Sequence, residues 1–286
     1  MRPAGLALAL AALLTGCMPP SWGASALLHP PRRPIAGAPA LPHHDFIVDS
    51  DGATLRGWLF PSRSPGGKPA VLYLHGVGDN RESGEWIADR LVRAGHDVVL
   101  YDGRAHGEST GDACTYGFLE KRDLSRVLDR LGIEQVVVVG VSLGAAVALQ
   151  AAAEDPRIAA VVGVATFSDL AAIARDRAPS FASDGQIREA FKLAQREGRF
   201  EVDAVSPVRA ARAIRIPVLL VHGAEDHETR PVHSERVFAA LAGPKRLLIV
   251  DGAGHNDALG RAWPQVEAWI AEAVTAAPRQ TAARPP

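Results

Sequence analysis

The sequence predicts an α/β fold in which helices cover both faces of a mainly parallel, eight-stranded sheet. Short and nearly continuous apolar runs recur along the chain, as expected for strands that are buried on both faces. Segments with helical periodicity lie between these runs, and such alternation is typical of parallel sheets. With 286 residues, 47% of them hydrophobic, the chain is long enough for one large domain.

The first two predicted strands form a hairpin. Phe46–Val48 and Thr54–Phe60 flank the pair Asp51-Gly52, which favours a tight turn. Six later strands are predicted at residues 70–74, 97–101, 136–139, 159–165, 218–221 and 246–250. Helices are predicted between them at residues 83–94, 118–131, 143–154, 233–241 and 262–273.

The motif Gly140-Val141-Ser142-Leu143-Gly144 is the most informative part of the chain. It follows a run of four valines and precedes a helix-prone segment. A nucleophile elbow needs this context, because the serine must sit in a strained turn between a strand and a helix. The two glycines remove side chains where strand and helix approach most closely. An ordinary turn with a capping serine is the alternative.

A candidate acid and a candidate base follow two later strands. Asp226 comes just after Val218–Val221, and His255 comes just after Arg246–Val250. The carboxyl ends of parallel strands meet at one edge of a sheet, where sites form. A serine hydroxyl needs a base to take its proton, and a histidine base needs a carboxylate to orient it. The pattern predicts Ser142 as nucleophile, His255 as base and Asp226 as orienting acid.

These motifs, in this order, resemble the α/β-hydrolase superfamily over residues 46–270. Tyr73-Leu74-His75-Gly76 resembles the strand end before the oxyanion loop. Residues 101–109 resemble a D-x-R-G-H-G-x-S loop, with Ala105 where glycine is usual. Residues 115–123, with Thr115-Tyr116-Gly117, Glu120 and Asp123, resemble compact bacterial lysophospholipase-like or thioesterase-like serine hydrolases.

The resemblance implies roles for further residues. The oxyanion hole is expected to use the backbone N–H groups of Leu143 and Val77. His75 is expected to shape a loop rather than act as a base, and Asp102, Arg104 and His106 to support the oxyanion loop. Asp169 is a competing acid, because some relatives carry the triad acid after the sixth strand; there it also has a structural role at a helix N-terminus.

The long connection after the sixth strand is expected to form a small lid at about residues 168–215, with helical patterns at Leu170–Arg175 and Gln186–Arg196. By analogy, a lid of this size favours small or medium acyl groups. Four phenylalanines either contact an acyl group or pack the lid to the body: Phe167, Phe181, Phe191 and Phe200.

The N-terminus resembles a bacterial lipoprotein signal peptide. Arg2 precedes the apolar run Ala4–Leu14, which is too short to span a bilayer. Leu14-Thr15-Gly16-Cys17 resembles a lipobox, so residues 1–16 are expected to be removed and Cys17 to carry acyl chains that anchor the protein. This predicts a lipid-anchored protein of the cell envelope, at the outer membrane and facing the periplasm. A plain secretory peptide is the alternative.

Composition shifts predict the remaining boundaries. Residues 17–44 are rich in proline and are expected to be an extended linker, which could hold the domain several tens of Å from the lipid at about 3 Å per residue. The hydrolase domain is predicted at residues 45–275 and a disordered tail at 276–286. Cys114 is expected to be a packed thiol without a disulfide partner.

A net charge of −1 gives no reason to expect nucleic-acid binding. A zinc site at His222, His227 and His233 is possible, but no accompanying metal motif supports it, so neither a metal nor a cofactor is expected. The predicted substrate is a small acyl ester or thioester. The alternatives are a prolyl-oligopeptidase-like peptidase, although the N-terminal domain usual there is missing, and a non-catalytic binding lipoprotein. The oligomeric state is not predicted.

Overall fold

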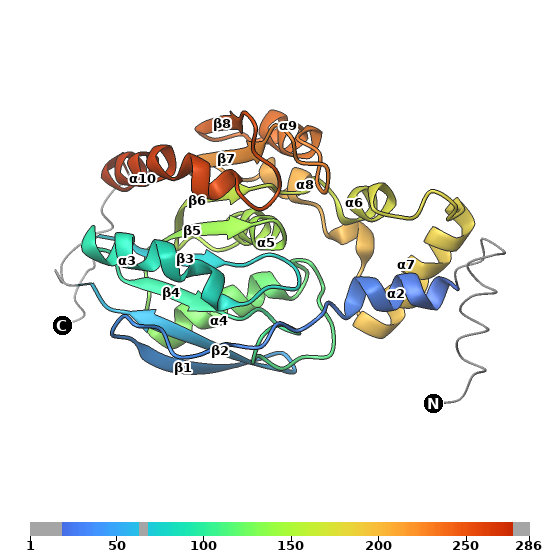
Figure 1. Cartoon of the computed structure of the whole chain (residues 1–286), viewed down its shortest axis with the longest axis horizontal. Helices are drawn as coiled ribbons and strands as arrows, with labels where there is room; N and C mark the ends of the chain where they lie inside the picture. Colours follow the sequence, from blue (N-terminus) through green and yellow to red (C-terminus); the bar gives the residue numbers. More distant parts are fainter. Residues whose placement is uncertain (1–18, 63–67, 277–286) are drawn as a thin grey trace.

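One sheet contains the eight strands of the described chain, in the order β1-β2-β4-β3-β5-β6-β7-β8 (Figure 1). The computed structural model describes residues 19–62 and 68–276. β2 pairs antiparallel with β1 and β4, and all later neighbours are parallel, which confirms the predicted class. The strands are β1 (His44–Ser50), β2 (Ala53–Phe60), β3 (Ala70–Leu74), β4 (Val98–Tyr101), β5 (Val136–Val141), β6 (Ile158–Val164), β7 (Val218–Gly223) and β8 (Lys245–Val250).

Helices cover both faces of the sheet. α3 (Glu85–Arg93), preceded by the short 3-10 turn η1 (Arg81–Gly84), and α10 (Ala258–Ala276) pack on one face. The other face is covered by α4 (Glu120–Leu131), α5 (Leu143–Ala152), α8 (Pro207–Ala211) and α9 (Val232–Ala240). The predicted helices lie within these bounds to a few residues, because their apolar stripes match the faces that they bury.

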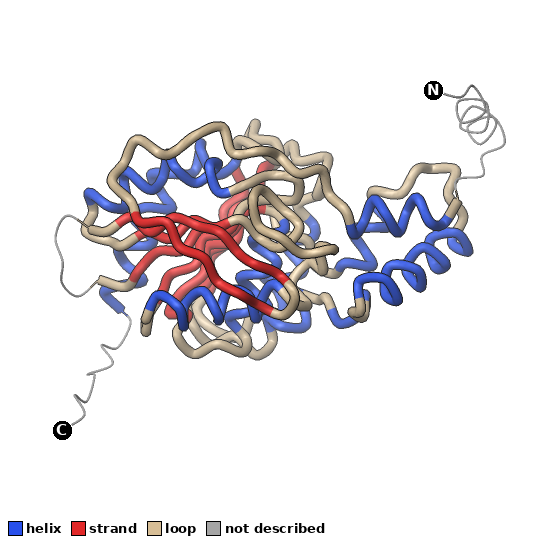
Figure 2. Tube along the Cα trace, turned by 90° about the horizontal axis from the view of Figure 1, so that it is seen from below, coloured by secondary structure: helices blue, strands red, loops and turns tan. Residues whose placement is uncertain are grey.

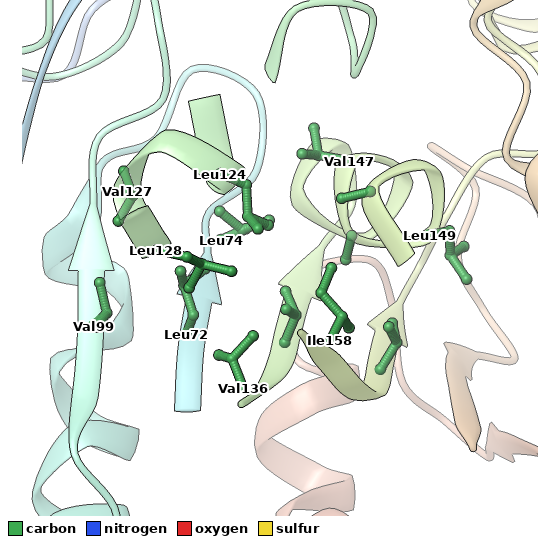
Figure 3. Close-up of a cluster of buried hydrophobic side chains, with 14 of the residues drawn as sticks. Leu72, Leu74, Val99, Leu124, Val127, Leu128, Val136, Val147, Leu149 and Ile158 are labelled. Atoms are coloured by element: carbon green, nitrogen blue, oxygen red, sulfur yellow. The ribbon is translucent and has the colours of Figure 1, made fainter. Parts of the chain in front are cut away.

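The two faces of the central strands supply two separate cores. Along β5, Val136 and Val138 pack toward α4 and α5, whereas Val137 and Val139 pack toward α3 and α10. Figure 3 shows the first of these cores, in which side chains from α4 and α5 meet those of the strands. Burial on both faces explains why the strands read as continuous apolar runs in the sequence.

A smaller lobe of helices lies beside the carboxyl ends of the strands. It contains α2 (Pro20–Leu28), α6 (Leu170–Asp176), α7 (Asp184–Gly198) and the short turn η2 (Val202–Ala204). Figures 1 and 2 show α2 alongside α7, although the two helices are far apart in the sequence. α6 and α7 confirm the helical patterns predicted between residues 168 and 215.

Helix α2 contradicts the expectation that residues 17–44 are extended and unfolded. Its proline occupies the first turn, where a helix tolerates a missing N–H. Ala24 and Leu28 are buried in a cluster with residues of the lid. A Cβ on Gly23 would come within 3.1 Å of the Ala190 side chain, so the glycine lets α2 approach α7 closely. Packing against the lid, which proline content does not reveal, therefore makes this segment helical.

The chain between α2 and β1 is extended but bound to the domain. The guanidinium of Arg32 donates to the Ser109 and Gly111 carbonyls, at 2.5 and 2.9 Å. The Ala36 N–H donates to the Glu82 carboxylate at 2.6 Å. The predicted signal peptide, Cys17 and nearly all of the predicted tail lie outside the described residues; Ala276, placed in that tail, ends α10 instead. No described helix is both long and apolar enough to cross a bilayer.

Candidate active site

Ser142 lies in a sharp turn between β5 and α5. Its backbone has φ 52° and ψ −109°, which is strained for a residue with a side chain. A Cβ on Gly140 would lie 2.3 Å from the Gly144 carbonyl oxygen, and a Cβ on Gly144 would lie 2.2 Å from the Leu74 carbonyl oxygen. Both positions therefore exclude any side chain, and this geometry is that of a nucleophile elbow.

Asp226 and His255 are hydrogen-bonded at the same edge of the sheet. Asp226 follows β7 by three residues and His255 follows β8 by five, while Ser142 directly follows β5. The Nδ1 of His255 lies 2.6 Å from Oδ2 of Asp226. If Nδ1 donates to the carboxylate, Nε2 keeps its lone pair and can accept a proton.

Asp226 is held by more donors than His255 alone. Its Oδ1 accepts from the backbone N–H groups of Glu228 and Thr229, at 2.9 and 2.8 Å. Its Oδ2 also lies 3.2 Å from Nε2 of the buried His222. Burial raises the pKa of Asp226, but the hydrogen bonds from His222, His255 and Thr229 outweigh it and hold the pKa well below its usual range. The carboxylate is therefore ionised at neutral pH.

His222 is a contact of the acid that sequence reasoning did not assign. Its Nε2 faces the Thr229 carbonyl at 2.6 Å and the Asp226 carboxylate, both acceptors, so Nε2 carries a proton. Its Nδ1 lies 2.6 Å from the Ser234 hydroxyl. The sequence signal for this contact is the position of His222, at a strand end and four residues before Asp226.

His75 fixes the loop after β3. The Gly103 N–H donates to Nε2 of His75 at 3.0 Å, so Nδ1 carries the proton and donates to the Gly76 carbonyl at 2.8 Å. Burial lowers the pKa of His75, which keeps the ring neutral. Because a peptide group is planar, fixing the Gly76 carbonyl also fixes the direction of the Val77 N–H, one of the two predicted oxyanion donors. This geometry agrees with the expected loop-shaping role of His75.

The expected supporting network divides into two parts. Asp102 accepts from the Arg81 and Glu108 N–H groups, at 2.7 and 2.8 Å, and also pairs with the Arg81 guanidinium, so it anchors the end of the loop that contains Val77. Arg104 instead binds Asp123 on α4, at 2.6 and 2.7 Å, away from that loop.

The His106 ring contacts the His75 ring in a tilted arrangement, with ring centroids 5.0 Å apart. Ala105 adopts φ +60°, which explains why glycine is the usual residue there. Cys114 is buried and free, and burial raises the pKa of its thiol well above the usual range, so the thiol is unreactive at neutral pH.

A small cavity of about 50 Å³ lies at the serine. Ser142, Leu143 and Val77 all line it, so the predicted nucleophile and both predicted oxyanion donors border one space. Phe167 and Tyr116 are among the residues of the other walls. Of the four lid phenylalanines, Phe167 lines this cavity, whereas Phe200 is buried in the lid core. Phe191 lines a neighbouring, larger cavity, and Phe181 is exposed.

Asp169, the competing acid, has another partner. It stands at the N-terminus of α6, as expected, but its side chain does not cap that helix. Its carboxylate instead accepts from the Ser206 hydroxyl at 2.6 Å, across the base of the lid. Of the two candidate acids, Asp226 is therefore the one in contact with His255.

A second set of serine, histidine and aspartate lies under the lid. The Ser168 N–H and hydroxyl both lie near Nδ1 of His233, at 3.2 and 2.9 Å, and Nε2 of His233 lies 3.1 Å from Asp176. Ser168 and His233 are fully buried. His222 and His233 thus belong to separate hydrogen-bond networks, and no cluster of three metal-ligating side chains occurs among residues 19–62 and 68–276.

Known proteins resemble this chain in sequence. Residues 69–201 match the family model of the alpha/beta hydrolase fold. The uncharacterized protein Rv2307c of Mycobacterium tuberculosis is 32% identical over 219 residues, which cover 74% of this chain and 72% of that protein. The uncharacterized protein YfhR of Escherichia coli K12 is 28% identical over 217 residues, which cover 73% of this chain and 71% of that protein.

Solved structures share the fold at lower identity. The Pyrococcus furiosus esterase Pf2001 superposes with a TM-score of 0.67 at 22% identity, covering 86% of this chain and 97% of the esterase. The 2,6-dihydroxy-pseudo-oxynicotine hydrolase superposes with a TM-score of 0.64 at 24% identity, covering 83% of this chain and 69% of the hydrolase. Together with the sheet order and the elbow at Ser142, these matches show that the chain belongs to the α/β-hydrolase superfamily.

Proposed function

We propose that this protein is a serine hydrolase that cleaves carboxylic esters or thioesters through an acyl-enzyme on Ser142. The observation that carries the proposal is the contact between His255 and Asp226 at the sheet edge where the strained Ser142 lies. Nε2 of His255 takes the proton of the Ser142 hydroxyl as its oxygen attacks the carbonyl carbon. The oxyanion then accepts hydrogen bonds from the Leu143 and Val77 N–H groups.

His255 next gives its proton to the leaving alcohol or thiol, and the acyl group stays on Ser142. A water molecule, deprotonated by His255, attacks the acyl-enzyme and releases the carboxylic acid. Throughout the cycle Asp226 remains ionised and stabilises the imidazolium form of His255, which its four hydrogen-bond donors support.

The test compares Ser142 with Ser168, the serine that contacts His233 under the lid. Ser142→Ala is expected to abolish p-nitrophenyl ester hydrolysis and fluorophosphonate labelling, with an unchanged circular dichroism spectrum. Ser168→Ala is the matched control and should keep both activities, because Ser168 is fully buried and, unlike Ser142, does not line the cavity. Labelled, active Ser142→Ala protein would contradict the proposal, as would wild-type protein that the probe does not label.

We also propose that Cys17 carries a lipid anchor that places the protein in the cell envelope, at the outer membrane facing the periplasm. The support is the lipobox-like Leu14-Thr15-Gly16-Cys17 after an apolar run. Wild-type protein expressed in a bacterium should incorporate labelled palmitate and sediment with membranes, and Cys17→Ser should do neither. Wild-type protein that is unlabelled and stays in the soluble periplasmic fraction would contradict the anchor.

A further inference from the structure

A larger cavity adjoins the small cavity at Ser142. Its volume is about 570 Å³, within the range of about 300–1,000 Å³ typical of small-molecule sites. The two cavities share five wall residues, so they adjoin each other at these residues: Leu27, Val77, Tyr116, Ala174 and Arg177. An acyl group on Ser142 that is too long for the small cavity would reach the large one by passing these shared residues.

The walls of the large cavity are mostly apolar and come mainly from two parts of the chain. The lid contributes α6, α7 and the turn between them, including Ala178 and Phe191. Helix α2 and the residues around it contribute further wall residues, including Trp22 and Ala26. These walls offer little to a charged or strongly hydrated group, and they suit a flexible hydrocarbon chain.

The five shared wall residues form the junction between the cavities. The polar side chains among them already have hydrogen-bond partners within the protein. The Tyr116 hydroxyl donates to the Leu27 carbonyl at 2.9 Å. Two nitrogens of the Arg177 guanidinium donate to the Glu228 carbonyl and the Thr229 hydroxyl, at 3.2 and 2.9 Å. The junction therefore presents the Tyr116 ring and aliphatic carbon to a passing chain. Trp22 and Phe181 are exposed in this lobe, and Trp22 also lines the cavity.

We propose that this cavity holds the hydrocarbon chain of a long-chain acyl substrate, and that α2 forms one wall of the acyl site. The inference rests on the proposed serine hydrolase function and names its substrate class. This substrate class is longer than the small or medium acyl groups that the size of the lid suggests. The reason is that α2, which lies outside the matched hydrolase region, adds a wall to the site.

The test measures kcat/KM of the full chain for p-nitrophenyl butyrate, octanoate and palmitate. Wild type should prefer octanoate and palmitate. Ala174→Phe narrows the junction and should lower the octanoate-to-butyrate ratio at least about tenfold, the effect of a few methylene contacts. Ala178 lines only the large cavity, so Ala178→Phe should lower the palmitate-to-octanoate ratio more than the octanoate-to-butyrate ratio. Ala26→Trp should act like Ala178→Phe from the α2 side.

Matched controls use exposed or differently directed positions on the same helices. Ala172→Phe on α6 and Ser25→Trp on α2 do not line either cavity and should keep the wild-type profile. Wild-type preference for butyrate, or cavity variants and controls with the same profile, would overturn the acyl site but leave the hydrolase. If no ester is cleaved, the hydrolase fails; binding of a fluorescent fatty acid to wild type, weakened by Ala178→Phe, then decides the cavity separately.

Discussion

At the scale of single residues, four N–H donors surround the Asp226 carboxylate. Its Oδ2 faces N–H groups of two histidines and its Oδ1 faces two backbone N–H groups. A carboxylate satisfies all four donors, because it is an acceptor on both oxygens. An amide cannot, since its NH₂ group would face a donor.

Asp226→Asn should therefore lower kcat by up to about 10⁴ while the protein stays folded, because His255 would shift its proton to Nε2. Asp169→Asn is the comparison: its amide oxygen can still accept from Ser206, so kcat should stay near wild type. Circular dichroism checks folding in both variants. A crippled Asp169→Asn protein beside an active Asp226→Asn protein would refute the assignment.

His75 offers a second prediction at this scale. His75→Ala removes the donor that fixes the Gly76 carbonyl, so the Val77 N–H loses its fixed direction. We expect kcat to fall with KM nearly unchanged, by no more than the roughly 10²–10³-fold loss of one oxyanion donor.

His96→Ala is the control, because His96 is also buried and also lies near a carbonyl, that of Pro69, but at the other end of the sheet. Equal losses of kcat in both variants, or an effect of His75→Ala on KM alone, would argue against a positioning role.

At the scale of elements, the strands and the positions of Ser142, Asp226 and His255 at strand ends could be predicted, whereas α2 could not. The strand predictions succeed because burial on both faces leaves continuous apolar runs, and the chain order of Ser142, Asp226 and His255 follows from strand ends. α2 is stabilised by contacts with α7, which is far from it in the sequence, and the prolines that flank α2 mask its helical pattern. The acyl cavity depends on the same long-range contact, so no local pattern reveals it.

Leu28 tests how α2 is held. It is fully buried, and a Cβ on Gly198 of α7 would lie 2.9 Å from its Cδ2 atom. Leu28→Ala should cost about 2–5 kcal/mol of docking free energy, since it leaves a cavity. We expect faster amide hydrogen exchange in α2, with the sheet still protected.

Ser25→Ala, on the exposed side of the same helix, should leave exchange unchanged. If Leu28→Ala leaves α2 as protected as in wild type, another contact holds the helix. If the whole sheet loses protection with it, α2 is part of the main cooperative unit instead of a separately docked element.

At the scale of the whole molecule, buried histidines make stability depend on pH. Burial, with a smaller effect of nearby His75, lowers the pKa of His106 to about 4. In the unfolded chain this histidine binds a proton at about pH 6.5. Between these values the unfolded state binds more protons, so the free energy of unfolding falls as pH drops from about 6.5 to about 4.

The contribution of His106 to this loss is up to about 3 kcal/mol. Urea unfolding across this pH window should show a shallower pH dependence for His106→Asn than for wild type. His44→Asn, at an exposed position, should keep the wild-type slope. Equal slopes for His106→Asn and wild type would show that His106 does not titrate as its burial implies.

If Cys17 is lipidated, the folded α2 also sets how far the cavity lies from the membrane. Pro19, a wall residue of the acyl cavity, lies two residues after Cys17. Two residues reach at most about 7 Å, against the several tens of Å of an extended linker. The cavity would then stay at the bilayer surface, and its substrates would arrive by lateral diffusion within the leaflet. Turnover would follow the surface density of acyl lipid, and diluting that lipid in an inert bilayer would slow it at constant bulk concentration.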